Sequence, residues 1–316
     1  MKNLVIVESP SKSKTIEKYL GEDFHVVSSK GHIRDLATTG KGGLGIDVDH
    51  DFEPTYKIST DKKAVVKELK ELAKKSEQVY LASDPDREGE AIAWHLANVL
   101  ELDMDQDNRI IFHEITKNAV TDAFQHPRKI DQNLVKSQEA RRMLDRIIGF
   151  KLSKLLQSKI KSKSAGRVQS VALRLIVERE NEIRAFKSEE YWTLAANITK
   201  DGKMFAASLN KVDGKKAELK NQEQVDAIIN RCQDDFTVAK IEKKVRKKEA
   251  KMPFITSTLQ QEASTKLGFG AKKTMQIAQK LYEGIALKGG SPEGLISYMR
   301  TDSTNLSQDA LNMVRG

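Results

Sequence analysis

Residues 78–90 carry the feature that most constrains this chain, a short apolar run that ends in three carboxylates. The apolar residues 79–82 predict a buried strand, and the apolar spacing from residue 88 to residue 100 predicts an amphipathic helix. Asp84, Asp86 and Glu88 therefore stand at a strand-to-helix turn. In an open α/β sheet, such turns lie at the carboxyl ends of the strands, where ligands bind.

Two interpretations of the three acids compete. Carboxylates at one turn repel one another unless a cation neutralises them, and all-oxygen ligands suit Mg²⁺. Alternatively, Asp84 is a helix N-cap, Pro85 is the first helical residue and the acids complement the helix dipole. Because capping uses one carboxylate and does not explain Arg87 among them, we favour the metal site.

The same pattern of strand, polar turn and helix occurs at the N-terminus. Residues 4–7 predict a buried strand that ends in Glu8, and a helix is expected from Ser13 to Leu20. If the two strands are parallel neighbours, Glu8 shares a crevice with the acidic turn, and Lys12 can reach an anion held there. The alternative for Glu8 is a solvent-exposed strand end.

Strands and helices alternate over the first 130 residues. We expect further strands at residues 24–28 and 109–112, helices at residues 61–75 and 116–124, and a glycine-rich excursion at residues 38–56. This alternation predicts an α/β domain with a largely parallel sheet.

The charge balance favours an anionic partner. The 316 residues include 54 Lys and Arg against 45 Asp and Glu, a net charge of +9, which points first to nucleic acid. In a helix predicted for residues 133–156, Arg142 and Arg146 lie one turn apart on one face. The single Cys232 excludes an internal disulfide and fits a reducing compartment, and no membrane span or signal peptide is evident.

A basic loop of small residues, 159–170, leads into a helix predicted for residues 168–183. Backbone N–H groups at a helix start bind phosphate, Ser164 and Gly166 permit close approach, and Arg167 stands beside them. A solvated basic linker is the alternative; we favour phosphate contact.

Beyond residue 190 the pattern changes to β and then back to helix. We expect a hairpin of residues 191–199 and 203–212, a helix at 221–232, an extended run at 236–248 that ends in a solvated basic cluster, and helices at 256–267 and 271–282.

Residues 294–303 predict a strand that runs into a polar turn, with Tyr298 and Arg300 on one face and Met299 opposite. A tyrosine oxygen can act as a nucleophile, and an arginine nearby favours its ionised form and binds phosphate. A strand tyrosine is more often a packing residue, and the spacing alone does not decide between the two.

Five motifs together resemble type IA DNA topoisomerases of bacteria, and they cover nearly the whole chain in order. They are LVIVESPSK at residues 4–12, SDPDREGEAIA at 83–93, ARRMLDR at 140–146, SAGRVQSVALRL at 164–175 and SYMRTDS at 297–303. Met299 and Val171-Ala172 favour the topoisomerase I type over topoisomerase III.

The resemblance implies an incomplete multi-domain toroidal fold. Its expected parts are an α/β TOPRIM domain at residues 1–132 with an excursion at about 36–58, a helical DNA-groove segment at 133–188, the first part of a β arch domain at 189–252 and the start of the tyrosine domain at 253–316. Because whole members of the family continue well beyond this length, we expect an N-terminal fragment that binds DNA weakly and does not complete relaxation.

The resemblance also implies functional residues. Glu8, Asp84, Asp86 and Glu88 would bind Mg²⁺, and Tyr298 would form a 5′-phosphotyrosyl link, assisted by Glu8, Lys12 and Arg300 at the cut phosphate. The single-strand groove would be lined by His32, Arg141, Arg142, Asp145, Arg146, Ser164, Ala165, Gly166, Arg167, Val168, Gln169 and Arg300.

The implied activity is ATP-independent relaxation of negatively supercoiled DNA by a cytoplasmic, nucleoid-associated monomer with no membrane partner. The absence of a complete P-loop motif is consistent with this, since residues 40–43 lack its other elements. The alternatives are a topoisomerase III-like decatenase, a TOPRIM nuclease or primase that needs no Tyr298, and a non-catalytic basic DNA-binding module.

Overall fold

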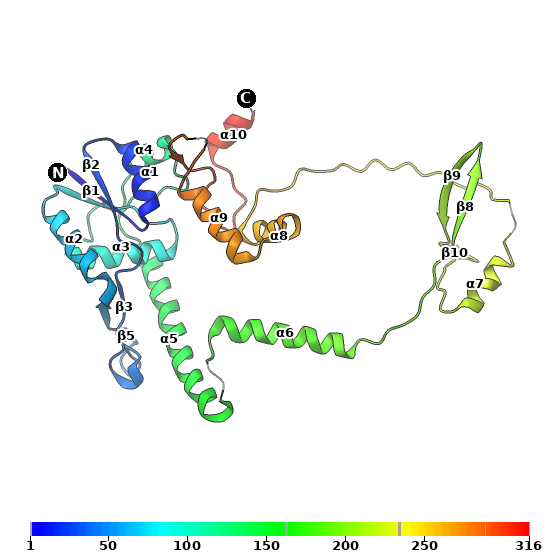
Figure 1. The fold of residues 1–316 in the computed structure, drawn as a ribbon, viewed down its shortest axis with the longest axis horizontal. Coiled ribbons are helices and arrows are strands. Elements are labelled where there is room, and N and C mark those ends of the chain that lie inside the picture. Colours follow the sequence, from blue (N-terminus) through cyan, green and yellow to red (C-terminus); the bar gives the residue numbers. More distant parts are fainter. Residues whose placement is uncertain (1, 162–163, 233–234, 288, 316) are drawn as a thin grey trace. The chain divides into compact units, whose positions relative to one another are not determined.

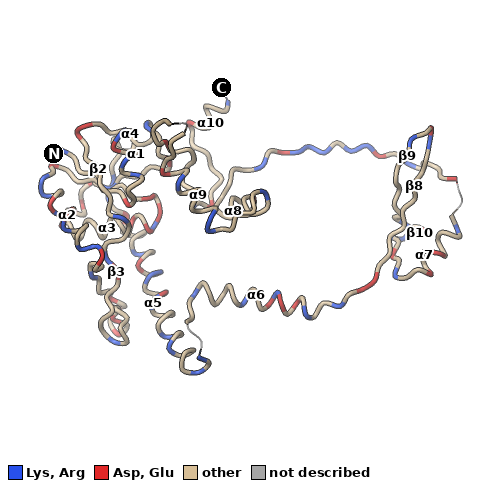
Figure 2. Tube along the Cα trace, viewed as in Figure 1, with Lys and Arg blue, Asp and Glu red and all other residues tan. Residues whose placement is uncertain are grey.

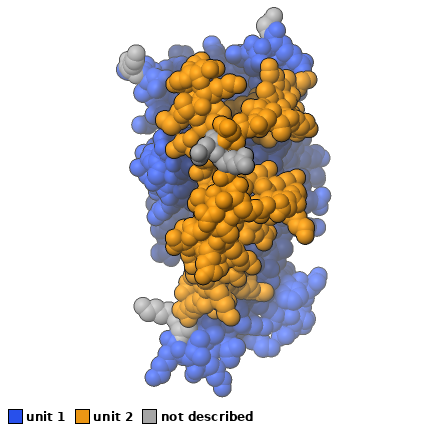
Figure 3. Space-filling view, turned by 90° about the vertical axis from the view of Figure 1, so that its right-hand side faces the viewer, with its two compact units in different colours: residues 1–169, 251–316 blue, residues 170–250 orange. Residues whose placement is uncertain are grey.

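The computed structural model describes residues 2–161, 164–232, 235–287 and 289–315. By internal contacts, the chain forms two compact units (Figure 3), one of residues 1–169 and 251–316 and one of residues 170–250. The predicted domain boundaries stay predictions, because this division follows contacts and joins the first and last segments in one unit.

A three-stranded parallel sheet lies at the centre of the first unit (Figure 1). β1 (Asn3–Val7) pairs with β2 (Phe24–Ser28) on one side and with β7 (Gln78–Leu81) on the other, both in parallel. The predicted parallel sheet is therefore confirmed. Because β1 and β7 run parallel, Glu8 after β1 and the acidic turn after β7 lie at the same end of the sheet.

The sheet is buried on both faces because the side chains of β1 alternate between two cores. Leu4 and Ile6 pack with α2 (Lys63–Lys74) and α3 (Arg87–Leu100). Val5 and Val7 pack on the opposite face, in a core to which α1 (Pro10–Leu20), α4 (Lys117–Ala123) and α9 (Ala271–Glu283) contribute. Each fully buried aliphatic side chain of this kind contributes about 1.5–3 kcal/mol.

Two predicted strands were wrong. Of residues 109–112, only Arg109 pairs with the sheet, through a single bridge to Leu81, and it also bridges Arg128. After that bridge, Ile110 and Phe112 serve as core residues and form no ladder. Residues 294–303 likewise form no strand. A short hairpin ends just before them, at Glu293. Both segments are held by packing and by scattered hydrogen bonds to parts of the chain that are distant in sequence, which a period-2 pattern does not reveal.

The glycine-rich excursion forms a two-tier hairpin. β3 (Arg34–Leu36) pairs with β6 (Tyr56–Ile58), and beyond them β4 (Ile46–Asp47) pairs with β5 (Glu53–Pro54). The single-turn 3₁₀ helices η1 (Lys41–Gly43) and η2 (Thr60–Lys62) flank these strands. The hairpin packs along α5 (Gln132–Ile160), as Figure 1 shows, through a small core of its own.

The last segment of the first unit packs against the α1 side of the sheet. α8 (Thr256–Leu267) contacts α9, and both helices match the predicted ranges; they end at Gly268 and Gly284, which have positive φ. A two-stranded hairpin of β12 (Ile285–Ala286) and β13 (Pro292–Glu293) follows, and α10 (Gln308–Arg315) comes last.

The second unit contains most of α6 (Arg167–Ala185) and a small β region. β8 (Ala195–Lys200) and β9 (Lys203–Ser208) form the predicted hairpin, with positive φ at Asp201 and Gly202. β10 (Lys211–Val212), β11 (Lys215–Lys216) and α7 (Gln222–Ile229) follow. Within the described ranges, no helix combines the length and apolar character needed to cross a membrane.

Candidate active site and nucleic-acid groove

The acidic turn joins the end of β7 to the start of α3. Asp86, and not Asp84, is the N-cap: its Oδ1 accepts the Gly89 N–H at 2.8 Å. The capping interpretation therefore applies to one acid of the three, but to a different one than the sequence indicated. The backbone at Gly89 also lies very close to that of Asp84. A Cβ at Gly89 would lie 2.1 Å from the Asp84 carbonyl oxygen, so only glycine fits there.

Arg109 is fully buried and holds the backbone of this turn. Its Nη1 donates to the carbonyl of Ser83 at 2.8 Å, and its Nη2 donates to that of Asp84 at 2.8 Å. The guanidinium pairs with the buried Glu90 carboxylate, at 3.0 Å from Nε to Oε2. Sequence reasoning missed this pair; an arginine at the start of the apolar run 109–112 was the available signal.

Glu8, Lys12 and Asp84 meet at the end of the sheet. The fully buried Lys12 ammonium contacts both carboxylates, and the Asp84 N–H donates to Glu8 Oε2 at 3.2 Å. Burial, together with the neighbouring Glu8, raises the pKa of Asp84 to about 8. Burial opposes ionisation of Glu8 as well, but hydrogen bonding with Asp84 and the Lys12 charge lower the pKa of Glu8 to about 2. One ammonium thus faces two carboxyl groups, an arrangement that favours a proton on Asp84 over one on Glu8.

The structure brings Tyr298 to this acidic turn. Its hydroxyl donates to Asp86 Oδ2 at 2.6 Å, and its backbone N–H donates to the His113 carbonyl at 2.7 Å. Arg300 Nη1 lies 3.7 Å from the same Asp86 oxygen. Burial, then the Asp84 charge and the Asp86 hydrogen bond, raise the pKa of Tyr298, while Arg300 opposes the shift. The phenol is therefore protonated at neutral pH, with a carboxylate placed to accept its proton.

Tyr282 is a second tyrosine at the site that sequence reasoning missed. It is fully buried, and its ring centroid lies 5.2 Å from that of Tyr298 and 5.2 Å from Lys12 Nζ. Its hydroxyl donates to the Phe112 carbonyl at 3.3 Å. Tyr282 thus joins the nucleophile candidate to the buried lysine through ring contacts.

Glu88 faces away from the other acids. Its Oε2 accepts a hydrogen bond from Gln138 Nε2 at 3.1 Å and lies 3.5 Å from His32 Nε2. The His32 contact is the largest cause of the lowered pKa of Glu88. His32 and Glu88 thereby belong to a neighbouring pocket.

The four carboxylates match Mg²⁺ in chemistry, since they offer only oxygen ligands. Their arrangement is not yet a metal cage: across the described ranges, no three acidic, histidine or cysteine side chains are grouped so that they could hold an ion. Lys12 contacts Glu8 and Asp84. The Tyr298 hydroxyl donates to Asp86, and Gln138 donates to Glu88. At Asp86, Oδ1 accepts the Gly89 N–H and Oδ2 accepts the Tyr298 hydroxyl, so an ion bound there would compete with Tyr298 for Oδ2.

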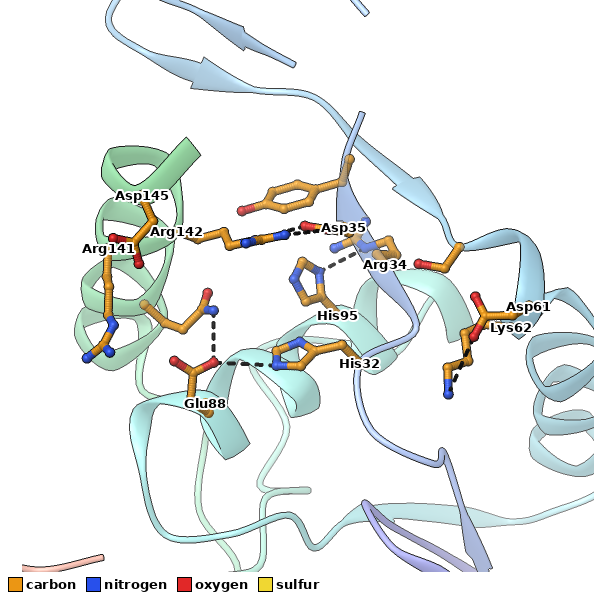
Figure 4. A pocket seen from close by; sticks show the side chains of 13 residues that line it. His32, Arg34, Asp35, Asp61, Lys62, Glu88, His95, Arg141, Arg142 and Asp145 are labelled. Atoms are coloured by element: carbon orange, nitrogen blue, oxygen red, sulfur yellow. Dashed lines mark hydrogen bonds and ion pairs between the residues drawn. The ribbon is translucent and has the colours of Figure 1, made fainter. Parts of the chain in front are cut away.

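A pocket of about 550 Å³ adjoins the acidic turn, between the excursion, α3 and α5 (Figure 4). His32, Arg141, Arg142 and Asp145 all line it, as four of the residues expected in the DNA groove. Figure 4 shows Arg142 directed at Asp35, to which its Nε and Nη2 donate at 3.0 and 2.5 Å.

Two other expected groove residues are engaged within the protein. Arg146 is buried; it donates to the Leu36 carbonyl at 3.3 Å and lies over the Phe150 ring at 5.0 Å. Arg167 Nε donates to Asp145 Oδ1 at 2.8 Å.

The loop before α6 is placed on α5 by Ala165, which is buried and whose N–H donates to Ser153 Oγ at 3.0 Å. Within the loop, Ser164 Oγ accepts from Gln169 Nε2 at 3.5 Å. Gly166 is half-buried, and Val168 is exposed at the start of α6. The loop thus joins the α5 side of the pocket at Asp145 through Arg167.

Comparisons with known proteins agree on one family. A family model described as DNA topoisomerase matches residues 129–316, and a model described as Toprim domain matches residues 3–115. The chain is 44% identical to full-length topoisomerase I from Thermotoga maritima, whose crystal structure it matches with a TM-score of 0.86. The match covers 99% of this chain and 51% of that one, so the chain spans about half the length of this relative.

Proposed function

This chain belongs to the type IA DNA topoisomerase family, with a Toprim domain at its N-terminal end, and we propose that its site cleaves and rejoins one DNA strand through Tyr298. The observation that carries the proposal is the position of the Tyr298 hydroxyl, 2.6 Å from Asp86 and beside Arg300. Two segments far apart in sequence meet there, and both are needed for the reaction.

In the proposed reaction, the Tyr298 oxygen attacks a backbone phosphorus. A tyrosyl O–P bond forms, the bond from phosphorus to the 3′ oxygen breaks, and the tyrosine becomes linked to the 5′ phosphate. Asp86 accepts the phenol proton, since its carboxylate already accepts the hydroxyl hydrogen. Attack by the released 3′ hydroxyl reverses the exchange, so rejoining needs no ATP.

Positive charge near Tyr298 supports phosphoryl transfer. Arg300 can bind a non-bridging oxygen, and the Lys12 ammonium lies among the acids, 5.2 Å from the Tyr282 ring. In this proposal, Lys12 or Asp84, which contact each other beside Glu8, gives a proton to the leaving oxygen. We propose that Glu8, Asp84, Asp86 and Glu88 supply the ligands for Mg²⁺, which when bound neutralises phosphate charge.

The proposed substrate is a single-stranded segment of negatively supercoiled DNA, which passes through the pocket beside the site. His32, Arg141 and Arg142 line that pocket, with Arg146, Asp145 and the loop 164–169 along α5. Phosphate contacts by such residues position the strand without reading its sequence. We infer relaxation of supercoils in the cytoplasm, by a monomer, as the activity of the whole protein.

The test uses a single-stranded oligonucleotide and separates the proposed reaction from its alternatives. Wild type should form an adduct that survives denaturation in detergent; Tyr298→Phe should form none, and Tyr191→Phe, which alters an exposed tyrosine of the second unit, should form it normally. A nuclease would keep cutting after Tyr298→Phe. A passive DNA-binding module would form no adduct and would be unaffected by Asp84→Ala or Asp86→Ala.

A further inference from the structure

Tyr282 forms and breaks no bond in the proposed reaction, yet it lies beside two groups that take part. It belongs to α9, and its side chain is fully buried. Its hydroxyl already donates to the Phe112 carbonyl at 3.3 Å. Its oxygen is therefore not a second nucleophile, and its part in the site lies in what its ring contacts.

We propose that Tyr282 is a positioning residue, whose ring fixes the place of the Lys12 ammonium relative to the Tyr298 oxygen. The inference deepens the proposed function and rests on it, because the parts of Lys12 and Tyr298 in the reaction are themselves proposed. Tyr282 touches no reacting atom and acts through these two side chains.

The first support is the surroundings of the buried lysine. The Lys12 ammonium contacts Glu8 and Asp84, and its Nζ lies 5.2 Å from the centroid of the Tyr282 ring. The face of an aromatic ring attracts a cation, and the attraction is stronger where water is excluded. Lys12 is fully buried, so the ring is a third attractive contact for an ammonium that has no water around it.

The second support is that one segment holds both tyrosines. The carbonyls of the consecutive residues Phe112 and His113 accept the Tyr282 hydroxyl and the Tyr298 backbone N–H, respectively. The two tyrosine rings have their centroids 5.2 Å apart and their planes at 66°, an edge-to-face arrangement that aromatic pairs favour. The ring that contacts Lys12 is thus fixed against the ring of the nucleophile.

The third support is the close packing of the backbone at the end of α9. The Leu295 N–H donates to the Leu281 carbonyl at 2.7 Å. A Cβ at Gly294 would lie 2.9 Å from the Tyr282 carbonyl oxygen. The chain that leads to Tyr298 therefore packs directly on the residues that carry the Tyr282 ring.

The test measures single-turnover adduct formation with a single-stranded oligonucleotide at increasing protein concentration. This separates the maximal rate from the half-saturating concentration. Tyr282→Leu removes the ring, whereas Tyr282→Phe keeps the ring and removes only the hydroxyl. Phe124→Leu is the matched control, because it removes a ring from the same core that packs on Phe24 and Tyr80. Thermal melts establish which variants are folded at the assay temperature.

A second pair of proteins keeps the ring and weakens only its attraction for a cation. Ring-fluorinated phenylalanine would be incorporated at position 282, and at position 124 as the control. Fluorine withdraws electron density from the ring face, which lowers its attraction for the Lys12 ammonium. The shape of the ring is nearly unchanged, so folding is preserved.

Tyr282→Leu should lower the maximal rate by about ten- to a hundredfold, the cost of reacting groups that are out of place. Its half-saturating concentration should not change, because the Lys and Arg side chains that Figure 2 shows along α5 are all retained. Tyr282→Phe and Phe124→Leu should stay close to wild type in both quantities. The fluorinated ring should slow the reaction relative to Tyr282→Phe at position 282 and should have no effect at position 124.

A maximal rate for Tyr282→Leu equal to that of wild type would overturn the role of the ring. An equally large loss in Phe124→Leu would also overturn it, since that result would show only a loosened core. If Tyr282→Leu does not fold, the fluorinated ring decides, and a rate equal to that of Tyr282→Phe refutes the inference. In each of these cases, a wild-type adduct at Tyr298 leaves the proposed function standing. A wild type that forms no adduct refutes both.

Discussion

The Tyr298 hydroxyl donates a 2.6 Å hydrogen bond to Asp86, which lies 212 residues earlier in the chain. The same carboxylate caps α3 through its other oxygen. Asp86 thus has three potential roles, as helix cap, as acceptor of the tyrosine proton and as metal ligand.

Removing the Tyr298 hydroxyl should strengthen divalent-ion binding. A hydrogen bond to a charged group contributes about 1.5–3 kcal/mol, which Asp86 loses when it turns to an ion. Tyr298→Phe should therefore bind Mn²⁺ about tenfold or more tightly than wild type, as measured by calorimetry. Tyr56→Phe, which removes a hydroxyl from Glu139 instead, should match wild type. Equal Mn²⁺ affinity in all three proteins would show that Tyr298 and the ion do not compete.

Gly89→Ala should be destabilising, because its Cβ would overlap the Asp84 carbonyl oxygen at 2.1 Å and push the acidic turn out of place. Gly149→Ala is the matched change within α5, where the nearest atom would be 3.9 Å away. Since alanine favours helix, Gly149→Ala should stabilise the chain by up to about 1 kcal/mol. Urea unfolding measures both; a Gly89→Ala variant as stable as Gly149→Ala would contradict the close-turn explanation.

Arg109→Met should cost about 3–5 kcal/mol, the typical loss when one partner of a buried ion pair is removed. The substitution leaves the buried Glu90 with the partly exposed Arg128 and the Asp131 N–H as partners, and it removes the donors to the turn carbonyls. Lys129→Met, which breaks an exposed pair with Asp105, should cost at most about 1 kcal/mol. Chemical denaturation measures the free energy of unfolding of both variants. A loss for Arg109→Met as small as that for Lys129→Met would contradict the role assigned to Arg109.

His95 should make stability fall in acid. Burial, and then the charge of Arg34, lower the pKa of His95 to about 3, while the unfolded chain has a value near 6.5. The folded-state pKa is depressed, so the contribution is complete above pH 6.5 and is lost as the pH falls toward 3, by at most about 1.4 kcal/mol per pH unit.

The variant His95→Gln keeps an acceptor for Arg34 Nε, which donates to His95 Nδ1 at 2.9 Å. Its stability should fall less steeply than that of wild type between pH 6 and pH 4, in thermal melts at matched ionic strength. Identical slopes for the two proteins would refute this assignment.

The sequence predicted the sheet well, because strands such as residues 4–7 are apolar throughout and end in acids. That pattern is typical of parallel strands buried on both faces. It also indicated that Glu8 and the acidic turn meet at one end of the sheet, and the structure places them together through Lys12.

Other parts of the site depend on contacts that a local pattern does not contain. The segment of Tyr298 was predicted as a strand, but it is positioned by a backbone hydrogen bond to His113, by hydrogen bonds to Thr256 and by packing on Tyr282. Arg109 and Tyr282 have partners that are distant in sequence, so neither spacing nor composition identifies their roles.

The most direct test of the proposed reaction is to locate the covalent link. Wild-type protein would be trapped with a single-stranded oligonucleotide, digested with protease and nuclease, and sequenced by tandem mass spectrometry. We predict a nucleotide mass on the peptide containing residues 297–300, attached to Tyr298 through a 5′ phosphate. A link to any other residue, or cleaved oligonucleotide with no modified peptide, would contradict the proposal.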